Sequence, residues 1–152
     1  RLLNVPVCTL PLETEVADFN KMTDYDIMVI DVTAMPDEAS QKISKIKAHV
    51  GAKDIGIVVT IPGSTSRAMI ELTMRRFADL APVIALTKLD ECETTATEFS
   101  AYVEQGARIS ILSGTKSVIG ASIFASENIL LQYLKENFSN HEAIMPTGKG
   151  LE

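Results

Sequence analysis

Short apolar runs alternate along the chain with longer segments in which apolar residues recur every three or four positions. Runs rich in Val and Ile, bounded by polar or turn-forming residues, are typical of buried strands. They predict strands at residues 5–8, 27–31, 55–61, 83–86 and 108–112. Strands that alternate with helical segments indicate a parallel sheet wrapped by helices.

The segments between these runs have the periodicity of amphipathic helices. They predict helices over residues 13–22, 36–50, 66–79, 96–104 and 121–138. Pro36 is suited to the first turn of the second helix, and Gly51 to its end. The apolar stripe of this helix consists of Ala39, Ile43, Ile46 and Val50.

The helix over residues 66–79 is expected to follow a turn at residues 62–64. Ser64 or Thr65 is expected to cap it, because a hydroxyl can accept from the free N–H groups of a first helical turn. The side chains expected to be buried are Met69, Ile70, Thr73 and Phe77.

These elements predict an α/β fold of three layers, with a mostly parallel sheet and helices on both faces, over residues 1–138. No repeat or linker divides this region. Residues 139–152 are expected to form a flexible tail that ends in a tag remnant, Leu151-Glu152. Because the chain opens at Arg1 without Met, we expect it to be part of a longer protein.

Composition narrows the possible partners and the compartment. The chain of 152 residues has a formal net charge of −6 at pH 7, which would repel nucleic acid and anionic membranes. Two cysteines, Cys8 and Cys92, fit a reduced cytoplasmic protein better than a disulfide scaffold. No apolar run approaches the ~20 residues of a membrane-spanning helix, so we expect no transmembrane segment.

The most informative polar string follows the strand predicted at residues 83–86. It reads Thr-Lys-Leu-Asp-Glu at residues 87–91, where an open α/β sheet binds ligands. The Asp90 carboxylate can accept from both the ring N–H and the exocyclic amine of guanine, which adenine cannot match. The Lys88 stem can lie over the base. A [Asn/Thr]-Lys-x-Asp string occurs by chance in roughly one chain in twenty of this length, so context must support it.

Further candidates follow the other predicted strands. Ser113, Gly114 and Lys116 are expected to lie beside the base as a supporting loop, where Gly114 lets the backbone approach. Asp31 ends the strand predicted at residues 27–31. Structural roles compete with these interpretations, since Asp90 could cap a helix, Lys88 could be a solvated lysine, and Ser113 to Lys116 could form an ordinary turn.

The order of elements and loops resembles the second half of the NTPase domain of signal-recognition-particle-type GTPases, in particular flagellar GTPases of the FlhF type. The matching residues are 24–31 (Asp-Tyr-Asp-Ile-Met-Val-Ile-Asp), 75–77 (Arg-Arg-Phe), 87–91 and 113–116 (Ser-Gly-Thr-Lys). The resemblance implies part of a P-loop NTPase domain. It assigns guanine binding to Thr87, Lys88 and Asp90, and indirect magnesium binding to Asp31.

For the intact protein, the resemblance implies binding of GTP or GDP with Mg²⁺, GTP hydrolysis and homodimerisation. It also implies flagellar assembly proteins as partners, and a place in the bacterial cytoplasm, at the membrane or at the cell pole. The phosphate loop, G-x-x-x-x-G-K-[ST], does not occur in the sequence and is expected upstream of Arg1. This chain alone is therefore expected to bind nucleotide weakly and to catalyse nothing.

The sequence departs from the family in several loops. In the family the first block ends in Asp-Thr-Ala-Gly-Arg, and Asp31 matches its Asp. Ala34 stands in place of the Gly that meets the γ-phosphate, and Met35 in place of the Arg, a cation that could offset transition-state charge. The family's acidic pair is replaced at residues 120–122, and its Gly near the paired threonines is replaced at Ala96. A degenerate pseudo-GTPase that serves as a protein-interaction scaffold is the alternative. A flavodoxin-like or response-regulator-like domain is a third, although the acidic pair of a regulator is missing.

Overall fold

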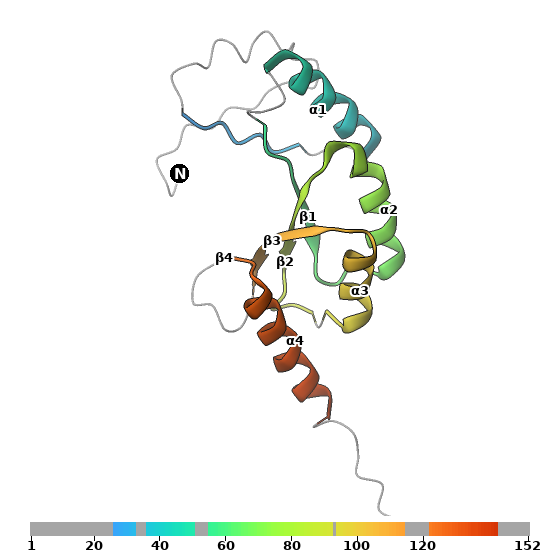
Figure 1. Ribbon diagram of the computed structural model, residues 1–152, viewed down its shortest axis with the longest axis vertical. Helices are drawn as coiled ribbons and strands as arrows, with labels where there is room; N and C mark the ends of the chain where they lie inside the picture. Colours follow the sequence, from blue (N-terminus) through green and yellow to red (C-terminus); the bar gives the residue numbers. More distant parts are fainter. Residues whose placement is uncertain (1–25, 33–35, 51–54, 93, 115–121, 143–152) are drawn as a thin grey trace, which may run out of the picture. The chain divides into compact units, whose positions relative to one another are not determined.

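The structure is a computed structural model that describes residues 26–32, 36–50, 55–92, 94–114 and 122–142 (Figure 1). The chain divides into two compact units, Arg1–Ile55 and Gly56–Glu152. The strand predicted at residues 5–8 and the helix predicted at residues 13–22 lie outside the described residues.

The first unit contains helix α1, Pro36–Val50, as predicted. Its first turn carries Asp37 and Glu38, whose negative charges favour the positive end of the helix dipole. Along the predicted stripe, Ala39 is buried, and Ile43 and Ile46 are half-buried.

The strand predicted at residues 27–31 is not formed. Residues 27–32 adopt no regular secondary structure, and the side chains of Ile27 and Val29 are 82% and 90% exposed. An apolar run becomes a buried strand only where a neighbouring strand completes its hydrogen bonds and another layer covers it. None of the described strands pairs with this run, so its composition alone does not make it a strand.

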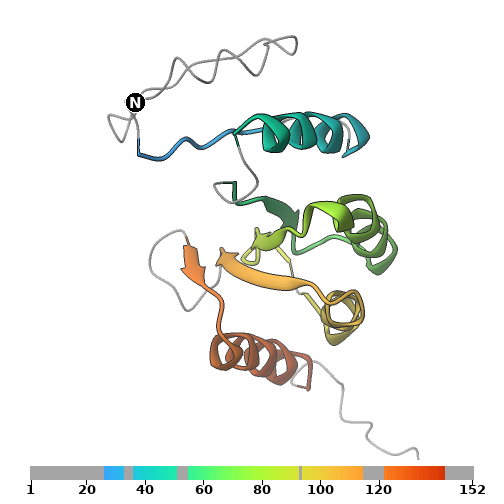
Figure 2. The same ribbon diagram turned by 45° about the horizontal axis from the view of Figure 1, so that its top comes forward.

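The second unit is built on a four-stranded sheet in the order β1-β2-β3-β4 (Figure 2). Strands β1 (Val58–Pro62), β2 (Val83–Thr87) and β3 (Arg108–Ser113) are parallel, and β4 (Ser122–Phe124) runs antiparallel to β3. The three parallel strands were predicted, although β1 begins three residues later than expected. The α/β fold class with a mostly parallel sheet is therefore confirmed, and the arrangement is consistent with three layers.

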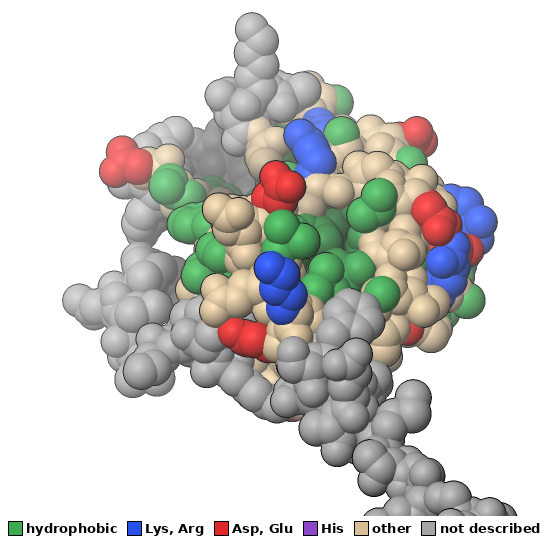
Figure 3. Space-filling view, turned by 60° about the horizontal axis from the view of Figure 1, so that its bottom comes forward, with side chains coloured by type: hydrophobic (Ala, Val, Ile, Leu, Met, Phe, Trp, Pro, Cys, Tyr) green, Lys and Arg blue, Asp and Glu red, His purple; other side chains and the backbone are tan. Residues whose placement is uncertain are grey.

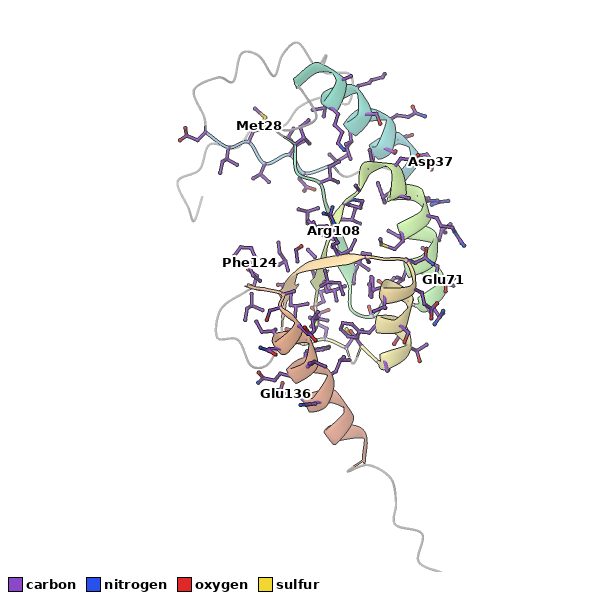
Figure 4. All side chains as sticks on the ribbon, viewed as in Figure 1. Met28, Asp37, Glu71, Arg108, Phe124 and Glu136 are labelled. Carbon is purple, nitrogen blue, oxygen red and sulfur yellow. The ribbon has the colours of Figure 1, made fainter. Side chains whose placement is uncertain are left out.

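Strand β4 replaces the beginning of a predicted helix. Helix α4 spans Glu127–Glu142, not residues 121–138. Residues 122–124 instead complete the free edge of β3, with Ile123 opposite Leu112 and Phe124 opposite Ile111. Ile123 packs against the core, whereas Phe124 points outwards and is 82% exposed (Figure 4). Pairing with β3 thus decides the conformation of a segment that helical periodicity misassigned.

Two helices connect the parallel strands. Helix α2 (Arg67–Phe77), with the short 3-10 helix η3 (Ala78–Leu80), occupies the predicted 66–79 region, and α3 (Ala96–Glu104) matches its prediction. The predicted buried face of α2 was partly wrong, because Ile70 and Met74 are buried while Met69 is half exposed. Thr73 and Phe77 are half-buried. A helical period fixes the width of an apolar face, but packing on the sheet selects its centre.

The core lies between the middle of the sheet and the helices. Ile84, Leu86 and Leu112 are fully buried, and the helices contribute Ile70, Met74, Phe99, Ala101, Tyr102 and Tyr133. The ring of Phe99 on α3 lies between those of Tyr102 and Tyr133, with centroid distances of 6.4 and 6.0 Å. The tilted contact between Phe99 and Tyr133 joins α3 to α4.

An exposed ion-pair network joins α2 to α3. Arg67 contacts Glu71 through Nε and Oε1 at 2.9 Å, and its guanidinium also pairs with Glu104. In the space-filling view, acidic and basic side chains lie side by side where α2 and α3 lie (Figure 3). Exposed pairs of this kind contribute little stability, because water and salt screen the charges.

The N-termini of α2 and α3 differ in their capping. Thr95 accepts a hydrogen bond from Thr97 N–H and donates to Glu98, whose carboxylate also accepts from Thr95 N–H at 2.9 Å. The hydrogen bonds that this carboxylate accepts, above all the one from the Thr95 hydroxyl, lower the pKa of Glu98. The cap of α2 is Ser66, not the predicted Ser64 or Thr65, and its side chain makes no capping hydrogen bond.

The substitution Thr95→Ala should lower the free energy of unfolding of the second unit by about 1 kcal/mol, because it removes the capping box. Ser66→Ala is the matched control and should change little. Urea denaturation followed by tyrosine fluorescence can measure both, since the chain has no Trp. The ordinary pKa of Glu98 is 4.5 and its folded pKa is lower, so the effect should be full above that value and fade as pH falls below it. Equal effects of the two substitutions would contradict the capping argument.

Candidate functional site

The loops that follow the parallel strands meet at one edge of the sheet. Parallel pairing aligns Pro62 with Thr87 at the ends of β1 and β2, and Leu86 with Leu112 in β2 and β3. Beyond these pairs, Gly63 N–H donates to the Thr87 carbonyl oxygen at 2.8 Å. The carboxyl ends of the strands therefore form a continuous surface, which is where open α/β sheets place ligands.

A tight turn at residues 88–91 presents the predicted base-binding side chains. Lys88 has a φ of 57°, in the left-handed region, and its carbonyl oxygen accepts from Glu91 N–H at 3.1 Å and from the Cys92 thiol at 3.1 Å. Leu89 is 3% exposed and anchors the turn in the core. The apolar residue in the middle of this polar string therefore holds the turn, while its neighbours Lys88 and Asp90 stay exposed.

The loop after β3 supports this turn through its backbone. Leu89 N–H donates to the Ser113 carbonyl oxygen at 3.2 Å. A Cβ placed on Gly114 would lie 2.2 Å from Asp90 Oδ1 and 2.9 Å from Leu89 N. Gly114 also has a φ of 83°, which favours glycine. The Asp90 carboxylate thus packs directly against the Gly114 backbone.

The loop after β1 is locked to the same turn from the other side. A Cβ on Gly63 would lie 2.7 Å from Cys92 Sγ, 2.8 Å from Leu89 Cδ2 and 2.8 Å from Thr94 Oγ1. Thr94 is buried, and its hydroxyl donates to the Gly63 carbonyl oxygen at 3.2 Å. Sequence reasoning did not assign these residues to the site. A Gly in the turn predicted at residues 62–64 was the only available signal for this close approach.

The Cys92 thiol has a packing role in this contact. Burial raises its pKa most, and the nearby Glu91 and Asp90 carboxylates raise it further, against a lowering by the hydrogen bond with Thr94. The sulfur therefore stays protonated at neutral pH and donates to the Lys88 carbonyl oxygen. A protonated, half-buried thiol is a poor nucleophile, which disfavours cysteine-based catalysis at this site.

Charge at the turn is mixed. The Lys88 ammonium lies 3.4 Å from Glu91 Oε2, and both side chains are about 60% exposed, at 60% and 63%. The Asp90 side chain is exposed and lies against Gly114, so a carboxylate, which only accepts hydrogen bonds, stands at the surface of this edge. Summed over these three groups the charge is about −1, which favours a ligand surface that donates hydrogen bonds and disfavours a phosphate.

The structure brings together most of the predicted site. Thr87, Lys88, Asp90, Ser113 and Gly114 all lie at the same edge. Lys116 falls outside the described residues.

Asp31 lies in the other unit and is exposed. Its predicted contribution to magnesium binding stays a prediction. Within the described part of the chain, no three His, Cys, Asp or Glu side chains gather as they would around a metal ion.

Comparison with known proteins gave no further assignment: no protein-family model and no curated protein matches the chain. Among the described residues, no helix combines the length and the apolar character that crossing a bilayer requires.

The substitution Gly63→Ala should destabilise the second unit by about 1–3 kcal/mol, because the new methyl group overlaps side chains on the neighbouring loop. Gly56→Ala is the matched control, since a Cβ there meets nothing within 4 Å. Urea denaturation gives both values, and amide exchange at Leu89 should accelerate only in Gly63→Ala. Similar effects at the two positions would contradict the close contact.

Proposed function

We propose that the turn at residues 88–91, together with Gly114, binds the base of a guanine nucleotide. The observation that carries the proposal is the contact between the Asp90 carboxylate and the Gly114 backbone, which holds a hydrogen-bond acceptor at the carboxyl edge of the sheet. Two loops that are 24 positions apart in the sequence supply the two halves of this contact. Both had been predicted as parts of one base-binding site.

The chemistry of the base explains the choice of guanine. A carboxylate only accepts hydrogen bonds, and its two oxygens can take the ring N–H and the exocyclic amine on one edge of guanine. Adenine presents an acceptor nitrogen on that edge and would be repelled by the carboxylate. The Lys88 stem can cover the base face, because its side chain is exposed beside Asp90.

The wider function we propose is that of a signal-recognition-particle-type GTPase domain, of the flagellar FlhF type. The intact protein would bind GTP or GDP with Mg²⁺, dimerise and act with flagellar assembly proteins in the bacterial cytoplasm, at the membrane or at the cell pole. The proposal assigns base binding to this chain and no hydrolytic step, because Ala34 and Met35 stand where the family has a glycine and a cation. Base contacts alone support affinities of about millimolar, or roughly 4 kcal/mol.

A protein-interaction scaffold is the second candidate. Val103 on α3 and Phe124 on β4 are 78% and 82% exposed, and large apolar side chains at the surface are common in protein interfaces. The two candidates differ in one measurable respect, since a scaffold requires no selectivity among nucleobases.

The substitution Asp90→Asn should exchange base selectivity. An amide donates as well as accepts, so it matches xanthine, which has a keto oxygen where guanine has its amine. Chemical-shift titrations with GMP, AMP and XMP should show GMP at a dissociation constant of about 1 mM and AMP at least tenfold weaker. The unsubstituted chain should bind GMP more tightly than XMP, and Asp90→Asn should bind XMP more tightly than GMP. Equal responses to GMP and AMP in the unsubstituted chain would overturn the proposal and favour the scaffold.

The substitution Gly114→Ala should weaken GMP binding by about tenfold or more, because its methyl group would displace the Asp90 carboxylate. Gly106→Ala is the matched control: Gly106 also has a positive φ, of 62°, but a Cβ there meets nothing within 4 Å. Both substitutions strain the backbone, but only the methyl group of Gly114→Ala contacts the Asp90 carboxylate. Equal loss of GMP affinity in the two variants would show that backbone strain, and not Asp90, is responsible.

A further inference from the structure

The ionised side chains of the turn can pair in two ways. Two carboxylates, Asp90 and Glu91, follow Lys88 in the sequence, and the Lys88 ammonium lies 3.4 Å from Glu91 Oε2. Pairing with Asp90 would neutralise the acceptor that the base needs. Pairing with Glu91 leaves the Asp90 carboxylate, which lies beside Gly114, without this cation.

We propose that Glu91 is a positioning residue that holds the Lys88 ammonium away from Asp90 and so keeps the Asp90 oxygens available to the base. The inference rests on the proposed function, since it concerns the same site. In this role Glu91 acts through Lys88 and need not touch the ligand itself. The role is electrostatic: Glu91 competes with Asp90 for one cation.

The backbone allows this role to be separated from the shape of the turn. Glu91 N–H and the Cys92 thiol both donate to the Lys88 carbonyl oxygen, and Leu89 is buried in the core. These contacts involve no atom of the Glu91 carboxylate. Glu91→Gln therefore removes the charge while the turn keeps its hydrogen bonds.

Removing that charge leaves Asp90 as the nearest carboxylate for Lys88 on the turn. A base would then have to break the Lys88–Asp90 pair before it could bind. Exposed ion pairs are weak, so the expected loss of GMP affinity in Glu91→Gln is about two- to fivefold. High salt screens the competing pair, so the loss should shrink in about 1 M NaCl.

A double-substitution cycle on the full chain tests the proposal. GMP titrations followed by NMR would compare the unsubstituted chain with Glu91→Gln, Lys88→Met and the double variant. Glu91→Gln should weaken binding in the presence of Lys88 and have no effect in the Lys88→Met background, where no cation remains to be held. Glu104→Gln is the charge control, because Glu104 also pairs with a cation, Arg67, away from the site. It should leave GMP affinity unchanged.

The outcomes separate the two proposals. Suppose that Asp90→Asn changes the preferred nucleotide from GMP to XMP while Glu91→Gln leaves the GMP affinity unchanged. That result would overturn the positioning role alone. An equal effect of Glu91→Gln with and without Lys88 would also overturn it, since the role acts only through that lysine. If the unsubstituted chain does not distinguish GMP from AMP, the proposed function fails and the positioning role fails with it.

Discussion

The parallel pairing of β2 with both of its neighbours is the constraint on which the site depends. Because β1, β2 and β3 run in the same direction, their following loops must emerge at one edge. The pairing of β2 with β3 shifts by one residue between Ile84, which pairs with Ile109, and Ala85, which pairs with Ile111. The hydrogen bonds from Gly63 N–H to Thr87 and from Leu89 N–H to Ser113 extend the sheet into the loops, so that strand pairing fixes the geometry of the turn.

Two glycines determine how closely these loops approach. At Gly63 the missing side chain admits Cys92, Leu89 and Thr94, and at Gly114 it admits the Asp90 carboxylate. The two contacts hold the turn from opposite sides. The turn can therefore carry exposed charged side chains, because its stability comes from backbone hydrogen bonds and the burial of Leu89.

The charges at the turn make chemical sense for a ligand that donates hydrogen bonds. Asp90 offers acceptors, Lys88 offers an aliphatic stem, and Glu91 partners the ammonium. A cradle for phosphate would instead present backbone N–H groups and unpaired cations. This contrast supports the proposal that the described edge binds the base.

The sequence by itself determined the parallel strands, most helix positions and the place of Thr87, Lys88, Asp90, Ser113 and Gly114 at strand ends, because hydrophobic periodicity is a local property. Only the tertiary structure decided that residues 27–31 form no strand, that residues 122–124 pair with β3 and that Met74, not Met69, faces the core. It alone placed Gly63, Cys92 and Thr94 beside the turn. These outcomes depend on contacts between distant segments, which no local pattern encodes.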